Sequence, residues 1–301
     1  TYVSDILKRK MIVYWPMNQA CWCKVDELFQ NQFNIKYFDN WEPETMGDYI
    51  GLFGNKCRFY RKEWPPGFSD ARFSRYDRYP GRRRLLGAIN KCKNGVLLQG
   101  GTIFDFIPAN QRLRILRELV PADDVRHAVD DFVLRNNLDK RIMGMHVRQT
   151  DAANINKDYF VKKLEATFSK RPKKRFFVCS DSTDLEHELR ERFGDNVIIN
   201  PKKAYPVRLD SNSGWITEVP GSGKYNVWRS TDSVKEALTD LYLLAKTRFV
   251  VRSHGSFSNI GYYLSLVEEF QGQDKVDFLT RLKIQHYNLY QRIIFRFERL
   301  K

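Results

Sequence analysis

A histidine, an arginine and an aspartate lie close together where an apolar run of the chain ends. The run spans residues 141–147 and predicts an interior strand, with His146 inside it and Arg148 and Asp151 just beyond it. Side chains alternate between the faces of a strand, so His146 and Arg148 point the same way. A guanidinium is a planar, permanently charged donor that suits phosphate oxygens. This stretch predicts an anion-binding site; the alternative is an ion pair between Arg148 and Asp151.

A second group of polar side chains lies between a predicted strand, 248–251, and a predicted helix, 259–269. Ser256 and Ser258 can cap that helix and leave backbone N–H groups for an anion; capping alone is the alternative. Asp181 follows a third predicted strand, 174–179. Ligands of open α/β sheets bind beyond the carboxyl ends of the strands, so we expect these strand ends to face one ligand.

From residue 141 onwards, apolar strand-like and helix-like runs alternate regularly, which predicts a parallel sheet covered on both faces. The periodicity predicts strands at 10–15, 35–38, 95–99, 141–147, 174–179, 197–199 and 248–251, and helices at 26–33, 109–120, 121–136, 157–169, 183–193, 233–246 and 259–269. We interpret 39–93 as mostly irregular and 200–230 as a polar loop. The last thirty residues predict a long helix.

The length of 301 residues suits two domains, because single cores stop growing at roughly 250–300 residues. We place the first domain at 1–138 and the second at 139–270. The remaining residues, 271–301, form a C-terminal helix that packs on the body of the protein in this interpretation.

A net charge of +15 favours anionic partners. Eight arginines interleave with aromatic residues between Arg58 and Arg84, a mixture that could bind single-stranded nucleic acid. The prolines and glycines of the same segment favour an irregular loop instead. A nucleic-acid-binding protein is therefore the alternative from a different functional class.

Several other classes find no support in the sequence. Gly221–Lys224 is no P-loop, because Glu218 replaces its first glycine and Tyr225 its Ser/Thr. No dinucleotide-type glycine fingerprint follows a predicted strand. The five cysteines lack metal or redox spacing, so we expect reduced thiols and no bound metal. No stretch has the apolar length of a membrane span.

The chain resembles the bacterial nodulation fucosyltransferase and the related eukaryotic α-1,6- and protein O-fucosyltransferases. Gly144–Asp151 resembles that family's glycine-x-His-Val-Arg-Arg-Thr-Asp segment. Shorter similarities lie at 13–18, 21–29, 177–181, 234–251 and 253–258. The resemblance is one of motifs, spread from about residue 11 to 265, and it is most extensive after residue 141.

The resemblance implies a GT-B fold, in which two Rossmann-like α/β/α domains face a cleft: an acceptor-side domain, 1–138, and a nucleotide-sugar-binding domain, 139–270. It implies an inverting, metal-independent glycosyltransferase that uses GDP-fucose and a glycan acceptor. Arg148 would bind the β-phosphate, His146 and Asp240 the guanosine end, and Asp181 the base or ribose. Ser256, with Ser258 beside it, would bind the diphosphate.

The sequence also departs from the family pattern. Gln149 stands in place of the second arginine, Ala152 in place of a frequent lysine, and Asn156 where some members carry a carboxylate. Asp151 and Asp158 are therefore the candidate general bases. Another nucleotide-sugar donor, or a sugar-binding protein without catalysis, are the alternatives of the same fold. We expect a cytoplasmic location; the alternative is a luminal catalytic domain of the Golgi or ER from which an N-terminal segment has been removed.

Overall fold

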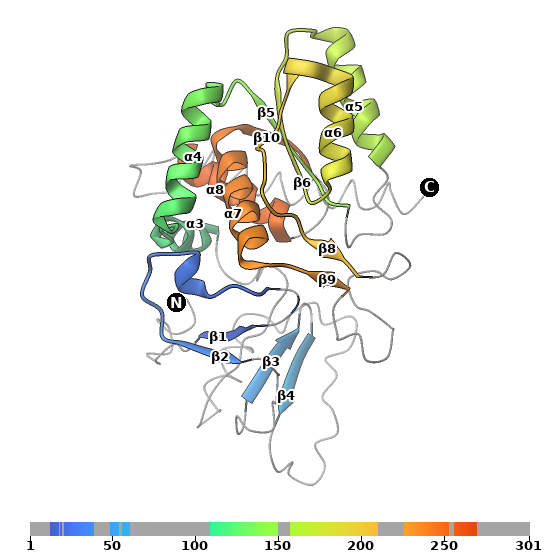
Figure 1. Cartoon of the computed structure of the whole chain (residues 1–301). Helices are drawn as coiled ribbons and strands as arrows, with labels where there is room; N and C mark the ends of the chain where they lie inside the picture. The colour runs from blue at the N-terminus through green and yellow to red at the C-terminus, as the bar shows by residue number, and fades with distance from the viewer. Residues whose placement is uncertain are drawn as a thin grey trace.

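A four-stranded parallel sheet forms the centre of the larger part of the molecule (Figure 1). The computed structural model describes residues 13–17, 19, 21–38, 49–53, 56–60, 109–149, 157–209, 226–252 and 256–269. The strands lie in the order β10 (Arg248–Arg252), β5 (Met143–Val147), β6 (Phe176–Ser180) and β7 (Val197–Ile198). All three pairings are parallel, which confirms the predicted mixed α/β class with a parallel sheet.

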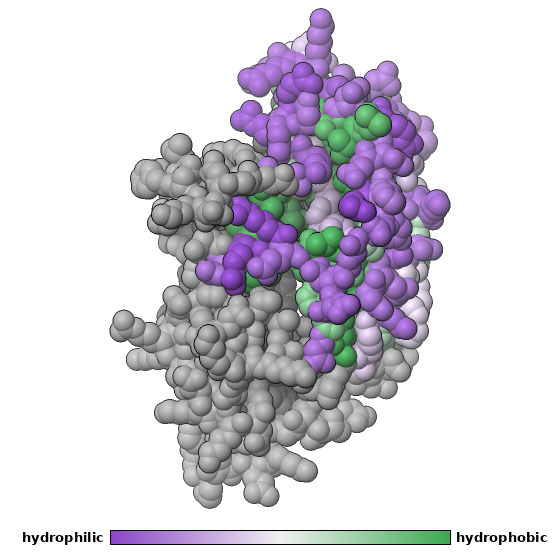
Figure 2. Space-filling model, turned by 90° about the vertical axis from the view of Figure 1, so that its left-hand side faces the viewer, coloured by the Kyte–Doolittle hydropathy of each residue, from purple (hydrophilic) through white to green (hydrophobic). Residues whose placement is uncertain are grey.

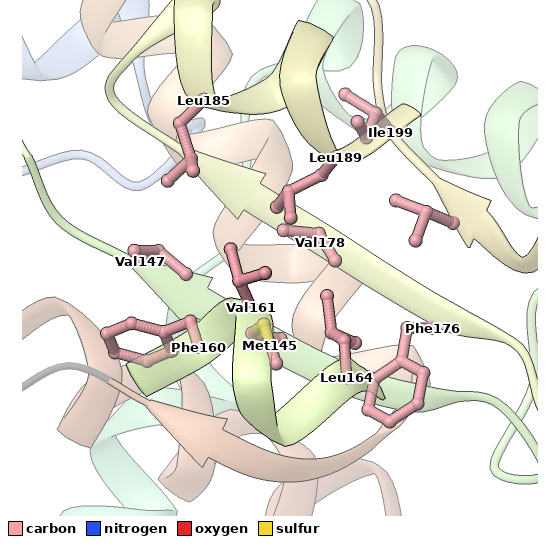
Figure 3. Close-up of a cluster of buried hydrophobic side chains, with 11 residues drawn as sticks. Met145, Val147, Phe160, Val161, Leu164, Phe176, Val178, Leu185, Leu189 and Ile199 are labelled. Carbon is pink, nitrogen blue, oxygen red and sulfur yellow. The ribbon is translucent and has the colours of Figure 1, made fainter. Parts of the chain in front are cut away.

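Helices α5 (Lys157–Lys170) and α6 (Thr183–Phe193) cover one face of this sheet. Alternate strand residues point toward them, among them Met145 from β5 and Val178 from β6 (Figure 3). Leu164 of α5 and Leu189 of α6 close the cluster, and both are completely buried. This packing holds the carboxyl ends of β5 and β6 in fixed positions, because a close-packed core is hard to compress.

The opposite face is covered by α4 (Asp123–Asn136), α7 (Thr231–Lys246) and α8 (Ser256–Glu269), and α3 (Ala109–Glu118) packs on α8. Phe177 and Cys179 of β6 point into this second core, where Leu243 and Leu244 of α7 meet them. The outer surface on the α4 side is mostly hydrophilic (Figure 2). Among the helices of the described residues, none has the length and apolar character to span a bilayer.

The amino-terminal part contributes two small sheets. β1 (Val13–Pro16) pairs in parallel with β2 (Ile35–Phe38), and β3 (Tyr49–Phe53) forms a hairpin with β4 (Lys56–Tyr60). The prediction of a mostly irregular 39–93 is therefore wrong at this hairpin. In its register Ile50 pairs with Phe59, a pairing that the aromatic content of the segment obscured in the sequence.

The helix predicted at 26–33 is also wrong, because the chain forms only the 3-10 turn η1 (Val25–Glu27) there. The following backbone pairs with a distant segment instead of continuing the helix. Gln30 donates its N–H to the carbonyl of Val120 at 2.9 Å, and Ala122 donates to the carbonyl of Leu28 at 2.8 Å. These bonds use backbone groups that a helix would need.

Two further predictions need correction. The polar loop 200–230 contains a short antiparallel pair, β8 (Val207–Arg208) and β9 (Val227–Trp228). α8 begins at Ser256, three residues before its predicted start at Asn259. The predicted strand 95–99, the helix of 271–301 and most of the arginine-rich segment 58–84 lie outside the described residues. The two-domain division at residue 138 stays a prediction. Of the two helices that precede it, α4 packs on the sheet and α3 packs on α8.

Candidate functional site

The connections of the sheet reverse direction between β5 and β10. From β5 the chain moves outward to β6 and β7, and it then returns to place β10 on the other side of β5. Such a topological switch point is where open α/β sheets bind ligands, beyond the carboxyl ends of the strands. Both polar stretches singled out from the sequence follow the two strands at this point.

His146 and Ser258 join these two stretches directly. Nδ1 of His146 lies 2.7 Å from Oγ of Ser258, at hydrogen-bonding distance. The His146 ring also packs against Phe257, with ring centroids 4.5 Å apart. His146 is 7% exposed and Ser258 is fully buried, so this contact belongs to the interior. It fixes the first turn of α8 against the end of β5.

The start of α8 differs from the prediction that both serines precede the helix. Ser256 is its first residue, and Ser258 lies within its first turn, where its Oγ is at hydrogen-bonding distance from His146. β10 runs alongside β5 with Arg252 opposite His146, and α8 starts shortly after it. The N-terminus of α8 therefore lies at the carboxyl edge of the sheet, where helix N–H groups favour an anion.

Arg148 and Asp181 directly follow the neighbouring strands β5 and β6. The Asp181 carboxylate accepts a hydrogen bond from the backbone N–H of Gln149, with Oδ1 and N 2.6 Å apart. The Gln149 side chain in turn donates to the carbonyl of Arg148 at 3.3 Å. Arg148 and Gln149 are half-buried. The Asp181 carboxylate thus fixes the backbone that carries the guanidinium of Arg148.

The two candidate general bases have different outcomes. Asp158 lies in the first turn of α5 and is exposed. Because α5 follows β5, this turn lies at the edge of the sheet where the carboxyl end of β5 lies. Asp151 lies outside the described residues. Asp158 is therefore the candidate base that the structure places at this edge.

Asp240 occupies a different position from the other predicted residues. It lies on α7, is 2% exposed, and forms an ion pair with Lys202, with Oδ2 and Nζ 3.1 Å apart. The amide of Asn200 donates to its second oxygen at 3.1 Å. The carboxylate is therefore held inside the protein, behind the strand ends of β6 and β7.

Sequence reasoning missed the group that surrounds Asp240. Lys202 also contacts Glu186 of α6, and Tyr205 donates its hydroxyl to Glu186 Oε2 at 2.6 Å. Glu186 accepts the backbone N–H of Ser180 at 2.8 Å, at the end of β6. The available signal was Glu186 itself, a charged residue that adjoins Leu185 on the buried side of a helix.

Two carboxylates share one ammonium in this buried group, and this sets the pKa values. Burial raises the pKa of Asp240 to about 7; Lys202 opposes the shift and the charge of Glu186 adds to it. Burial lowers the pKa of Lys202, but Asp240 and Glu186 outweigh it, so the net shift is upward. Lys202 therefore stays charged while Asp240 retains a proton more readily than an exposed aspartate.

The thiols and acidic groups of the described residues offer no metal centre. Within these ranges, no three His, Cys, Asp or Glu side chains are grouped so that they could hold a metal ion. Cys21, Cys23 and Cys179 are free thiols. Burial raises the pKa of the Cys179 thiol well above its ordinary value, so it is a poor nucleophile.

Comparison of the sequence with protein-family models and with curated proteins finds no match. Solved structures do match. Fucosyltransferase NodZ from Bradyrhizobium is 14% identical, with a TM-score of 0.48 over 87% of this chain and 85% of that chain. The chain is similar to this structure over most of both lengths. The NodZ α-1,6-fucosyltransferase co-crystallised with GDP gives 14% identity and a TM-score of 0.49, over 87% and 84% of the two chains. The apo form of POFUT1 is 13% identical in sequence, with a TM-score of 0.43 over 87% of each chain.

Proposed function

We propose that this protein is a glycosyltransferase that transfers fucose from GDP-fucose to a saccharide acceptor. The observation that carries the proposal is the contact between His146 and Ser258. It brings the arginine-containing stretch after β5 and the serine-containing stretch before α8 together at the switch point of the sheet. These are the two stretches with which the family resemblance associates the diphosphate.

In this proposal the donor diphosphate lies between Arg148 and the N-terminus of α8. A guanidinium and helix N–H groups are donors that suit phosphate oxygens. His146 and Asp240, which the resemblance assigns to the guanosine end, are buried and engaged with Ser258 and Lys202. We therefore assign them the task of shaping the nucleotide site from behind rather than contacting the nucleotide.

The reaction follows from this placement. The oxygen of an acceptor hydroxyl attacks C1 of the donor sugar from the side opposite the diphosphate, which inverts that carbon. The C1–O bond to the diphosphate breaks and GDP leaves with the electron pair. Arg148 and the N-terminus of α8 stabilise the charge that develops on GDP, which is the task of a metal ion in other transferases. Asp158 or Asp151 accepts the proton of the acceptor.

Calorimetric titration with GDP, UDP and CMP at moderate salt tests the donor. We expect selective binding of GDP, weakened at least about tenfold in Arg148→Ala, because a charge-assisted contact contributes more than a neutral one. Arg171→Ala is the matched control, an exposed arginine at the opposite edge of the sheet. Selective binding of UDP or CMP would overturn the donor, and binding of none of the three would overturn the transferase.

Turnover requires a separate assay. Release of GDP from GDP-fucose in a mixture of glycan acceptors, followed by NMR spectroscopy, reports both activity and the configuration at C1. Activity that persists in EDTA supports metal-independent transfer. Tight GDP binding without release of GDP would favour a sugar-binding protein that lacks catalysis.

A further inference from the structure

Four exposed apolar side chains gather around the β8–β9 pair. Trp22 is 44% exposed and Trp228 is 37% exposed, and their rings stack with centroids 5.8 Å apart and planes 28° apart. Val207 and Leu209 are 54% and 47% exposed. We call these four residues the tryptophan surface. Exposed aromatic groups of this size mark binding sites more often than single exposed leucines do.

Hydrogen bonds of the backbone hold the two tryptophans in place. The N–H of Trp22 donates to the carbonyl of Arg229 at 3.1 Å, and the N–H of Arg229 donates to the carbonyl of Gln19 at 2.8 Å. The hydroxyl of Thr231 donates to the carbonyl of Trp22 at 2.7 Å. The backbone at both tryptophans is therefore ordered before any ligand arrives, which lowers the entropic cost of binding.

Val207 and Leu209 extend the same surface. Val207 pairs directly with Trp228 across the two strands, so both side chains lie on one face. Leu209 lies just beyond β8, and its backbone N–H donates to the carbonyl of Asn226 at 3.3 Å, next to the start of β9. Trp22, Trp228 and Val207 thus form one apolar group, and Leu209 follows it in the chain.

The tryptophan surface lies on the side of the sheet that carries the candidate donor site. β9 leads through Ser230, the N-cap, into α7. α7 runs antiparallel to the strands, since it precedes β10 and packs on the sheet, so its N-terminus lies at the carboxyl edge. Figure 1 shows the β8–β9 pair beyond the carboxyl ends of β5 and β6, next to the amino-terminal part of the chain.

The size of the tryptophan surface and the charges around it favour a neutral saccharide as its occupant. A stable protein partner buries roughly 20–30 residues on each side, far more than four side chains. Nucleic acid needs a surface of one positive sign, whereas the charged residues near this surface in the chain carry both signs: Lys24, Asp26, Arg208, Arg229 and Asp232. A pyranose ring presents apolar C–H faces to an indole and hydroxyl groups to the charged rim.

We propose that the tryptophan surface binds sugar rings of the saccharide acceptor by stacking. The inference rests on the proposed function for the direction of transfer, since it identifies this saccharide as the acceptor. Saccharides with flat, equatorially linked rings fit best, because such rings expose continuous C–H faces.

Titration of the full 301-residue protein with cellotetraose and with chitotetraose tests this inference. Tryptophan fluorescence and calorimetry measure the binding. We expect Trp22→Ala and Trp228→Ala each to weaken binding at least about fivefold, and the phenylalanine variants to weaken it less, because they keep an aromatic face. GDP affinity stays unchanged in all four variants. Tyr159→Ala is the matched control, because it removes an aromatic side chain, 49% exposed, from α5.

Each outcome decides between the proposals. Absence of binding to both tetrasaccharides, or equal binding by the wild type and both alanine variants, overturns the inference. Binding of oligo(dT) that depends on the tryptophans and is lost with added salt overturns it in favour of nucleic acid. Saccharide binding that depends on the tryptophans without any GDP binding supports this surface and refutes the proposed transferase. The phenylalanine variants keep the test valid if an alanine variant fails to fold.

Discussion

The carboxylate of Asp181 accepts a 2.6 Å hydrogen bond from the backbone N–H of Gln149 and so ties the end of β6 to the residue that follows Arg148. This bond crosses between neighbouring strands of the sheet beyond their regular ladder, which ends at Val147 and Ser180. A second hydrogen bond holds the same strand end from α6: Glu186 accepts the backbone N–H of Ser180. The position of Arg148 thus depends on two acidic residues, Asp181 just after β6 and Glu186 of α6.

Replacement of Asp181 by alanine should weaken GDP binding about tenfold. The substitution removes a charge-assisted hydrogen bond, of roughly 1.5–3 kcal/mol, that holds the backbone next to Arg148. Asp181→Asn keeps an acceptor oxygen and should retain most of the affinity. Calorimetric titration with GDP measures both variants.

Asp195→Ala provides the control for Asp181, because it removes an exposed aspartate on the far side of α6. If Asp181→Asn lost as much affinity as Asp181→Ala, the negative charge itself would matter and the positioning role would be refuted.

Replacement of Ser258 by alanine should lower the free energy of unfolding by roughly 1–3 kcal/mol, the cost of removing one partner of a buried hydrogen bond. The bond to His146 lies in the interior, where water cannot replace it readily. Urea unfolding measures the change. Ser169→Ala, an exposed serine on α5, should be neutral. Equal stability of the Ser258 variant and the wild type would show that the 2.7 Å contact contributes little.

The sequence predicts the β5–α5–β6–α6 unit almost to the residue, because its signal is local. Met145, Val147 and Val178 alternate along their strands with residues of the opposite face. Leu164 in α5 and Leu189 in α6 each belong to an apolar series with the spacing of a helix. The η1 region escapes prediction for the opposite reason. The backbone around Leu28 and Gln30 pairs with Val120 and Ala122, a contact that no local pattern reveals.

Of the candidate site, too, the sequence predicts one part and not another. That Arg148 and Asp181 lie at the same edge of one sheet follows from the strand pattern alone, since parallel strands place their carboxyl ends together. The burial of Asp240 does not follow, because its partner Lys202 lies in a segment without periodicity, which the sequence indicated only as a polar loop. Tertiary pairing of charges is invisible to a local pattern.

The stability of the protein should fall as the pH rises toward 7, because of Asp240. Its pKa is raised from 3.8 to about 7 in the folded protein, so the folded state binds this proton more tightly than the unfolded chain. The stabilisation is complete below the unfolded pKa and is lost as the pH rises through the folded pKa. The slope reaches at most about 1.4 kcal/mol per pH unit.

Urea unfolding between pH 5 and 8, about the window in which this proton leaves, measures the effect. Asp240→Asn should remove most of the slope, because its neutral amide cannot titrate. Asp232→Asn, an exposed residue of the same helix, should leave the slope unchanged. A slope that persists in Asp240→Asn would assign the titration to another group.

Replacement of Lys202 by methionine should be among the most destabilising single changes in the molecule. The side chain of Lys202 is 4% exposed and contacts both Glu186 and Asp240, so its loss leaves two carboxylates buried without their cation. Removing one partner of a buried ion pair costs roughly 3–5 kcal/mol. Lys203→Met, at the exposed neighbouring position, provides the control for urea unfolding.

The cost of Lys202→Met should shrink at low pH and on adding Asp240→Asn, because both changes remove buried negative charge that the lysine neutralises. Adding Glu186→Gln as well should recover further stability, since a buried polar group costs less than a buried unpaired charge. The same destabilisation in Lys202→Met with and without Asp240→Asn, at every pH, would show that packing of the lysine stem matters rather than its charge. The group of Lys202, Glu186 and Asp240 would then stabilise the fold through packing rather than through the pairing of charges.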